Sequence, residues 1–239
     1  TNGFLLQTVH NPLGDGRNFI SLGGSDFAGV QRAAEAFLAG LKPAGKSLTV
    51  GRLFQLETAK PGPKPLTGAE IAVRENIDFA YAIECGQILR RFGTPGYGKM
   101  FRRAIDVMAP SITNAPDEKA GKGGTLSFGV LPLLWDIIEE SDQFSDADRA
   151  FISDILYAYA HRLRYAREDT DDMGAGGNNH EADSALYAGL YFNRYYPDLE
   201  IGRLLVERMD RYFASPITHW RVGDNATGYG DATWFANLQ

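Results

Sequence analysis

The chain has 239 residues, of which 44% are hydrophobic and 23% charged. These proportions are ordinary for a folded protein and exclude disorder, collagen and coiled coil as descriptions of the whole. The 24 Lys and Arg against 30 Asp and Glu give a formal charge of -6, which argues against a nucleic-acid-binding protein because such proteins carry a basic footprint. The single cysteine, Cys85, excludes an internal disulfide and a thiolate-rich metal site, and no apolar run reaches the roughly 18 residues that span a membrane.

Residues 1–58 are expected to form a small α/β unit. Three apolar runs predict strands, over Phe4–Val9, Asn18–Leu22 and Leu48–Leu56. Between the second and third, Ser25 or Asp26 is placed to cap a helix that ends near Gly40. The strand, Gly-Gly turn and helix lack the full glycine fingerprint of a nucleotide-binding loop, so a structural role for this turn is the preferred interpretation.

A proline-rich segment at 59–67 is expected to be a linker, and after it the apolar period becomes helical. Helices are predicted over Glu70–Arg91, Tyr97–Ala109, Leu126–Glu140, Arg149–Arg167, Glu181–Tyr195 and Leu199–Phe213. The segment Ser145–Asp148 is predicted to be an N-cap box for the helix over Arg149–Arg167. The predicted helices form three successive pairs at a spacing of about 50 residues, close to the period of stacked helical repeats.

Each predicted helix has one apolar stripe and needs neighbours to cover it. Two architectures satisfy this need: a superhelical solenoid or a closed ring of helix pairs, the α/α toroid. The long, polar, glycine-rich loops favour the ring, so residues 68–239 are expected to be a mainly α catalytic domain. A ring of six or seven pairs needs on the order of 300 residues at that spacing. The chain is therefore expected to be a fragment of a longer polypeptide, ending before the ring closes.

Two polar loops carry the candidate chemistry. The first ends in Asn179 and His180, and the second contains Arg221 and Tyr229. These residue types suit removal of the C5 proton of a uronic acid, because an amide and a guanidinium can bind the charge that grows on the sugar carboxylate. Imidazole and phenol can move the protons. The reaction is a β-elimination and consumes no water.

The same segments resemble a known family. Gly177-Asn178-Asn179-His180, followed by Leu186–Phe192 and Arg194–Asp198, resembles the Asn-His loop and next helix of toroidal polysaccharide lyases, those acting on glucuronan or alginate above all. Asp224–Tyr229 resembles the Gly-Tyr segment that carries their catalytic tyrosine. The glycine-rich helix start near Gly23 resembles the small α/β unit found ahead of some carbohydrate-active domains.

The resemblance implies a role for each residue of the two loops. Asn179 would neutralise the carboxylate, His180 would be the base or a proton relay, Arg221 a second carboxylate contact, and Tyr229 the acid or both acid and base. Asn178 competes with Asn179, since one of the two is expected to cap the helix. Asn178 and Asn225 are further substrate-contact candidates. The indoles of Trp220 and Trp135 are candidates for stacking on a sugar, with burial in the core as the alternative.

No cofactor is expected, and the expected partner is an anionic polysaccharide rather than nucleic acid or a membrane. The acidic run at 168–172 lacks EF-hand spacing and favours a solvated loop over a Ca²⁺ site, so no metal site is predicted, and His10 and His161 receive no role. Because the chain does not begin with methionine, a signal peptide removed earlier is compatible with it, and a periplasmic or extracellular location is expected.

Two other functions stay open. An inverting glycoside hydrolase on the same helical ring would need two carboxyl groups on opposite sides of the sugar, and Glu181, Asp183 and Asp224 are the candidates. A non-catalytic glycan-binding repeat protein is the third. Product chemistry separates the first two, and binding without turnover would mark the third.

Overall fold

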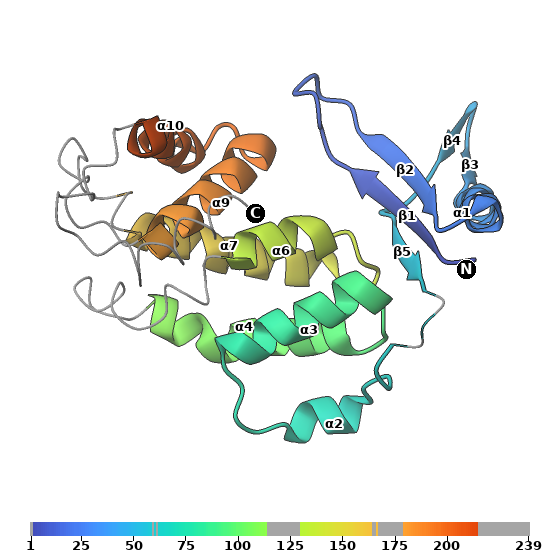
Figure 1. Ribbon diagram of the computed structural model, residues 1–239, viewed down its shortest axis with the longest axis horizontal. Coiled ribbons are helices and arrows are strands. Elements are labelled where there is room, and N and C mark those ends of the chain that lie inside the picture. Colours follow the sequence, from blue (N-terminus) through green and yellow to red (C-terminus); the bar gives the residue numbers. More distant parts are fainter. Residues whose placement is uncertain are drawn as a thin grey trace, which may run out of the picture. The chain divides into compact units, whose positions relative to one another are not determined.

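The computed structural model describes residues 2–58, 60, 62–113, 130–163, 166 and 179–214. This part of the chain is mainly helical with a small sheet near the N-terminus (Figure 1). The strands are β1 (Phe4–Val9), β2 (Phe19–Gly24), β3 (Lys42–Ala44), β4 (Ser47–Thr49) and β5 (Phe54–Glu57). The helices are α1 (Phe27–Gly40), α2 (Gly68–Val73), α3 (Phe79–Phe92), α4 (Tyr97–Thr113), α6 (Val130–Ile138), α7 (Asp146–Arg162), α9 (Asn179–Tyr195) and α10 (Glu200–Ala214).

The N-terminal sheet is antiparallel, with β1 between β2 and β5. Helix α1 packs on β1 and β2 (Figure 1), and Phe4, Leu6 and Ala33 form the buried centre of this contact. The α/β character predicted for this segment is confirmed. The strand predicted over Leu48–Leu56 is wrong as a single element, because β4 pairs only with β3 in a separate hairpin and β5 pairs with β1.

Two glycines let α1 approach the sheet closely. A Cβ on Gly24 would lie 2.2 Å from the backbone nitrogen of Val30, and one on Gly29 would lie 2.2 Å from the carbonyl oxygen of Gly3. Asp26 is the N-cap of α1, and its carboxylate accepts a hydrogen bond of 2.8 Å from the Gly29 backbone N–H. The glycine turn is therefore structural, and a carboxylate of the chain itself already occupies the helix N-terminus.

The helical segments begin and end near most of the predicted positions. Ser145 and Asp148 form the predicted cap of α7, with the Asp148 backbone N–H donating to Ser145 Oγ over 3.1 Å. The helix predicted over Glu70–Arg91 is instead two helices, α2 and α3. They separate where Asn76 takes a φ of 54° and Asp78 caps α3 by accepting from the Tyr81 backbone N–H.

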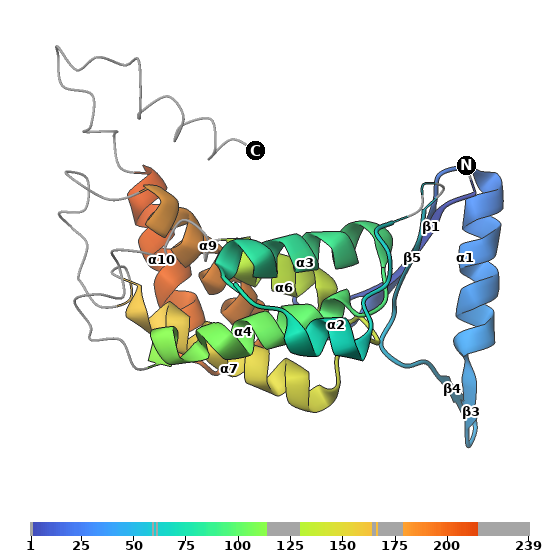
Figure 2. The same cartoon turned by 90° about the horizontal axis from the view of Figure 1, so that it is seen from below.

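The chain divides into two compact units: Thr1–Met108 with Leu134–Ser153, and Ala109–Leu133 with Asp154–Gln239. In the first, Trp135 is fully buried and packs against Phe101 and Phe144. In the second, α9 and α10 pack together as a helical hairpin (Figure 2). Within the described residues, no helix combines the length and the hydropathy of a membrane-spanning segment. The boundary predicted at 59–67 stays a prediction, as does closure of the helices into a ring.

Candidate functional site

The Asn-His pair lies at the start of a long helix. Helix α9 begins at Asn179, so Asn179 and His180 are both in its first turn. The free backbone N–H groups at a helix start carry partial positive charge and favour an anion nearby. The backbone position of the pair therefore suits contact with a carboxylate. The side chains of both residues lie outside the described part of the structure.

The other predicted site residues of the two loops belong to segments outside the described part of the chain. Asn178, Trp220, Arg221, Asn225 and Tyr229 lie outside the described residues. Convergence of the two loops into one pocket consequently stays a prediction, and so do the roles that the resemblance implies for these side chains.

Further along α9, two described side chains share one helix face. Asp183 and Tyr187 are four residues apart, which is the spacing of neighbours on a helix surface. Burial raises the pKa of the Tyr187 phenol, and the nearby Asp183 carboxylate raises it further. Tyr187 is therefore a protonated hydroxyl at neutral pH. Sequence reasoning gave it no role, although it belongs to the segment that resembles the lyases.

Trp135 does not present a face to a ligand. Its side chain is 0% exposed, lies parallel to the Phe101 ring at a centroid distance of 6.1 Å, and meets Phe144 edge to face at 5.0 Å. Its indole N–H donates to Ser153 Oγ over 3.3 Å. This corrects the expectation that Trp135 stacks on a sugar: it is a core residue of the first unit.

The Cys85 thiol is not a candidate nucleophile. Cys85 is buried in α3, and burial raises its pKa to about 12. Because the thiolate is the nucleophilic form of cysteine, this thiol is inert at neutral pH.

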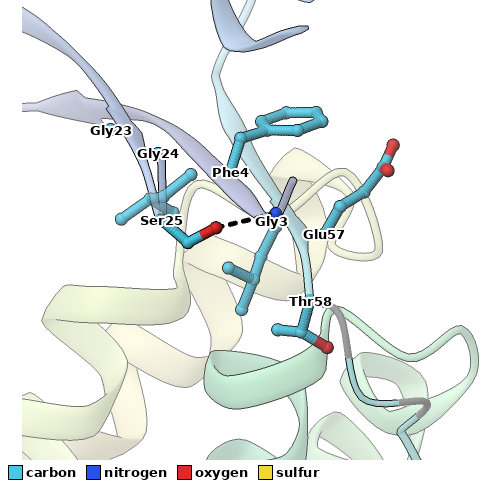
Figure 3. A pocket seen from close by; sticks show the side chains of 9 residues that line it. Gly3, Phe4, Gly23, Gly24, Ser25, Glu57 and Thr58 are labelled. Carbon is cyan, nitrogen blue, oxygen red and sulfur yellow. Dashed lines mark hydrogen bonds between the residues drawn. The ribbon is translucent and has the colours of Figure 1, made fainter. Parts of the chain in front are cut away.

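A pocket of about 400 Å³ opens at the end of the N-terminal sheet (Figure 3). Most of its polar groups are already engaged: Ser25 Oγ accepts from the Gly3 backbone N–H over 3.1 Å, and Glu57 pairs with Arg32. Close by, Asp26 has its pKa lowered by hydrogen bonds from the backbone N–H groups of Asn2 and Gly29 and so stays negative. This pocket is poorly suited to an anionic sugar.

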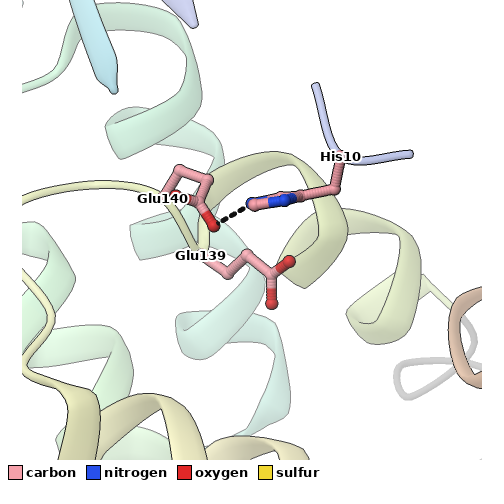
Figure 4. Close-up of side chains that lie close together, drawn as sticks. All are labelled: His10, Glu139 and Glu140. Atoms are coloured by element: carbon pink, nitrogen blue, oxygen red, sulfur yellow. Dashed lines mark hydrogen bonds and ion pairs between the residues drawn. The ribbon is translucent and has the colours of Figure 1, made fainter. Parts of the chain in front are cut away.

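A second group of polar side chains lies where the turn after β1 meets the end of α6 (Figure 4). His10 Nε2 is 2.5 Å from Glu140 Oε1, and Arg52 Nη1 donates to the same oxygen over 2.6 Å. Glu139 is adjacent, and both glutamates are buried. Sequence reasoning missed this group, since His10 and Glu140 are 130 residues apart and no local pattern joins them.

Comparison of the chain with protein-family models, with curated proteins and with solved structures found no match.

Proposed function

We propose that the protein is a polysaccharide lyase that cleaves a uronic-acid-containing glycan of the glucuronan or alginate type by β-elimination. The observation that carries the proposal is the Asn179-His180 pair in the first turn of α9, directly after the glycine-rich segment that resembles the lyase loop. A uronate carboxylate at that helix start would meet backbone N–H groups and the Asn179 amide together.

In the proposed reaction, the C5–H bond of the uronate breaks and its electron pair is delocalised into the carboxylate as an enolate-like intermediate. That pair forms the C4–C5 double bond as the C4–O bond breaks, and the glycosidic oxygen takes up a proton and leaves as a hydroxyl. Asn179 and Arg221 would bind the carboxylate as its charge grows. His180 and Tyr229 would remove and deliver the protons. No cofactor takes part, and an extracellular or periplasmic site of action suits a polymeric substrate.

The test is the appearance of the unsaturated product. Purified protein mixed with glucuronan or alginate should produce an ultraviolet absorbance from the double bond conjugated to the carboxylate. Tyr229→Phe should lower kcat by about 10²-fold or more, the range expected for loss of a proton-transfer group. Tyr196→Phe is the matched control, because Tyr196 is 38% exposed and follows the opposite end of α9.

His180→Gln should cause a comparable loss, with His161→Gln as its matched control in α7. Wild-type activity in the Tyr229→Phe and His180→Gln variants would refute the proposed roles. Release of a reducing sugar without an unsaturated end would instead identify a hydrolase, and binding without any product would identify a glycan-binding protein.

A further inference from the structure

The cluster at the end of α6 brings together three side chains able to bind a metal. One ligand atom from each of His10, Glu139 and Glu140 can be chosen so that all three lie within 4.8 Å of one another. They come from two separate places in the first unit: the turn after β1 supplies the imidazole, and the two residues after α6 supply the carboxylates (Figure 4).

The Glu140 carboxylate is satisfied on one side only. Oε1 is contacted by both His10 Nε2 and Arg52 Nη1. Oε2 has no hydrogen-bond partner in the structure. The Glu140 side chain is only 3% exposed, so solvent does not replace the missing partner. A buried carboxylate oxygen without a donor is costly, and an adjoining cation would remove that cost.

We propose that His10, Glu139 and Glu140 bind a divalent transition-metal ion, with Zn²⁺ preferred. One imidazole and two carboxylates form a mixed nitrogen and oxygen set, which suits Zn²⁺ better than Mg²⁺ or Ca²⁺, since these prefer oxygen alone. Three protein ligands leave a fourth position of the zinc tetrahedron for water. Zn²⁺ should also bind more tightly than Mn²⁺ in the same set.

Binding requires a small exchange of partners. Glu140 supplies one carboxylate oxygen to the ion, while Arg52, which donates to Oε1, orients the carboxylate from outside the metal shell. His10 gives up its contact with Oε1, and its ligating nitrogen binds the ion through a lone pair, any proton on that nitrogen passing to solvent. The His10 side chain is 25% exposed, so the ion has a route from solvent.

The competing arrangement needs no metal. In it, His10 and Arg52 form an ion-pair network with Glu140, which holds the turn after β1 against the end of α6. Glu139 distinguishes the two arrangements. In the metal-bound arrangement Glu139 is a ligand, whereas in the metal-free arrangement the groups that contact Glu140 Oε1 are His10 and Arg52.

The experiment is titration of the chelator-treated full chain with ZnCl₂, followed by calorimetry and by thermal unfolding. Calorimetry should give one Zn²⁺ per chain. The Tm should rise with zinc concentration, because an ion that binds only the folded state stabilises that state. Glu139→Gln keeps the shape of the side chain and His10→Gln keeps a neutral polar group, and each should weaken zinc binding by at least about tenfold and reduce the rise in Tm at a given zinc concentration. A parallel titration with MnCl₂ should give weaker binding.

Glu35→Gln, on α1, and His161→Gln, on α7, are the matched controls and should leave zinc binding unchanged. His180→Gln should also leave it unchanged, which separates this site from the proposed catalytic loop. The proposal is overturned if no stoichiometric zinc uptake occurs, if the two cluster variants bind zinc as the wild type does, or if His180→Gln alone removes it. Tighter binding of Mn²⁺ than of Zn²⁺ would overturn the choice of ion.

Discussion

At the scale of single residues, Trp135 shows how an indole can have two interpretations in a sequence. Its flat apolar surface suits a sugar ring and a protein core equally well. Its place on α6 decides between them, since Leu131, Leu134 and Ile138 on the same helix are all buried as well. Trp135 lies on that inner face and packs between Phe101 and Phe144.

Truncation of Trp135 should therefore reduce stability rather than substrate binding alone. We expect Trp135→Ala to lower the free energy of unfolding by about 3–5 kcal/mol, the usual cost of removing a large buried aromatic side chain, and Trp135→Phe to cost less. Denaturant unfolding followed by circular dichroism measures both. Leu133→Ala, at a position 39% exposed on the same helix, is the control, and a Trp135→Ala loss no larger than that of the control would contradict the core assignment.

At the scale of elements, the sequence predicts the start of a helix correctly where a few neighbouring residues determine that start. The Ser145–Asp148 cap of α7 and the Asp26 cap of α1 were readable because capping depends on residues a few positions apart. The helix over Glu70–Arg91 was mispredicted because its apolar spacing continues through residues 74–78, whereas Asn76 and Asp78 end one helix and start the next. Periodicity alone does not detect such a break.

The cap of α2 gives a pH prediction. Thr67 and Glu70 form a capping box, with Glu70 accepting from the Thr67 backbone N–H over 2.7 Å. Hydrogen bonds from the Thr67 backbone and hydroxyl, and then from Lys64, lower the pKa of Glu70 from 4.5 to about 2. Since the folded pKa is the lower one, the stabilisation is present above pH 4.5 and is lost as the pH falls toward 2.

Carboxyl chemical shifts against pH should show this directly. In the wild type, Glu70 should titrate near pH 2, and in Thr67→Ala its midpoint should move up toward the ordinary value for glutamate. Ser145→Ala removes the cap of α7 instead and should leave the Glu70 titration unchanged. An ordinary midpoint for Glu70 in the wild type would show that the capping box does not form in solution.

At the scale of the whole molecule, the first compact unit is not continuous in sequence. It joins Thr1–Met108 to Leu134–Ser153, and the second segment supplies Trp135 and Phe144 to Phe101, and Glu140 to His10 and Arg52. No composition shift near residues 59–67 indicates these contacts. The sequence does not predict the His10 cluster, because His10 and Glu140 are 130 residues apart. Asn179 and His180 are neighbours in the chain and therefore form a local motif.

A fragment of residues 1–108 should therefore lack a complete core. We expect it to lose the near-ultraviolet circular dichroism of packed aromatic side chains and to unfold without a cooperative transition, because Phe101 would lose Trp135 and Phe144 and Gly86 would lose the Leu134 side chain packed on it. A fragment of residues 1–153 retains the partners from 134–153 and is the matched comparison. A sharp thermal transition in the shorter fragment at the temperature of the longer one would contradict the discontinuous unit.

The hairpin of α9 and α10 has a mechanical consequence. A Cβ on Gly189 would lie 2.9 Å from the Leu205 Cβ, and one on Gly202 would lie 2.3 Å from the Asn193 backbone nitrogen, so bare backbone fills the space between the helices at two levels. A side chain at either glycine would therefore push α9 and α10 apart. Since α9 begins at Asn179, the close packing of this hairpin is what holds the helix that starts with Asn179 and His180 against α10.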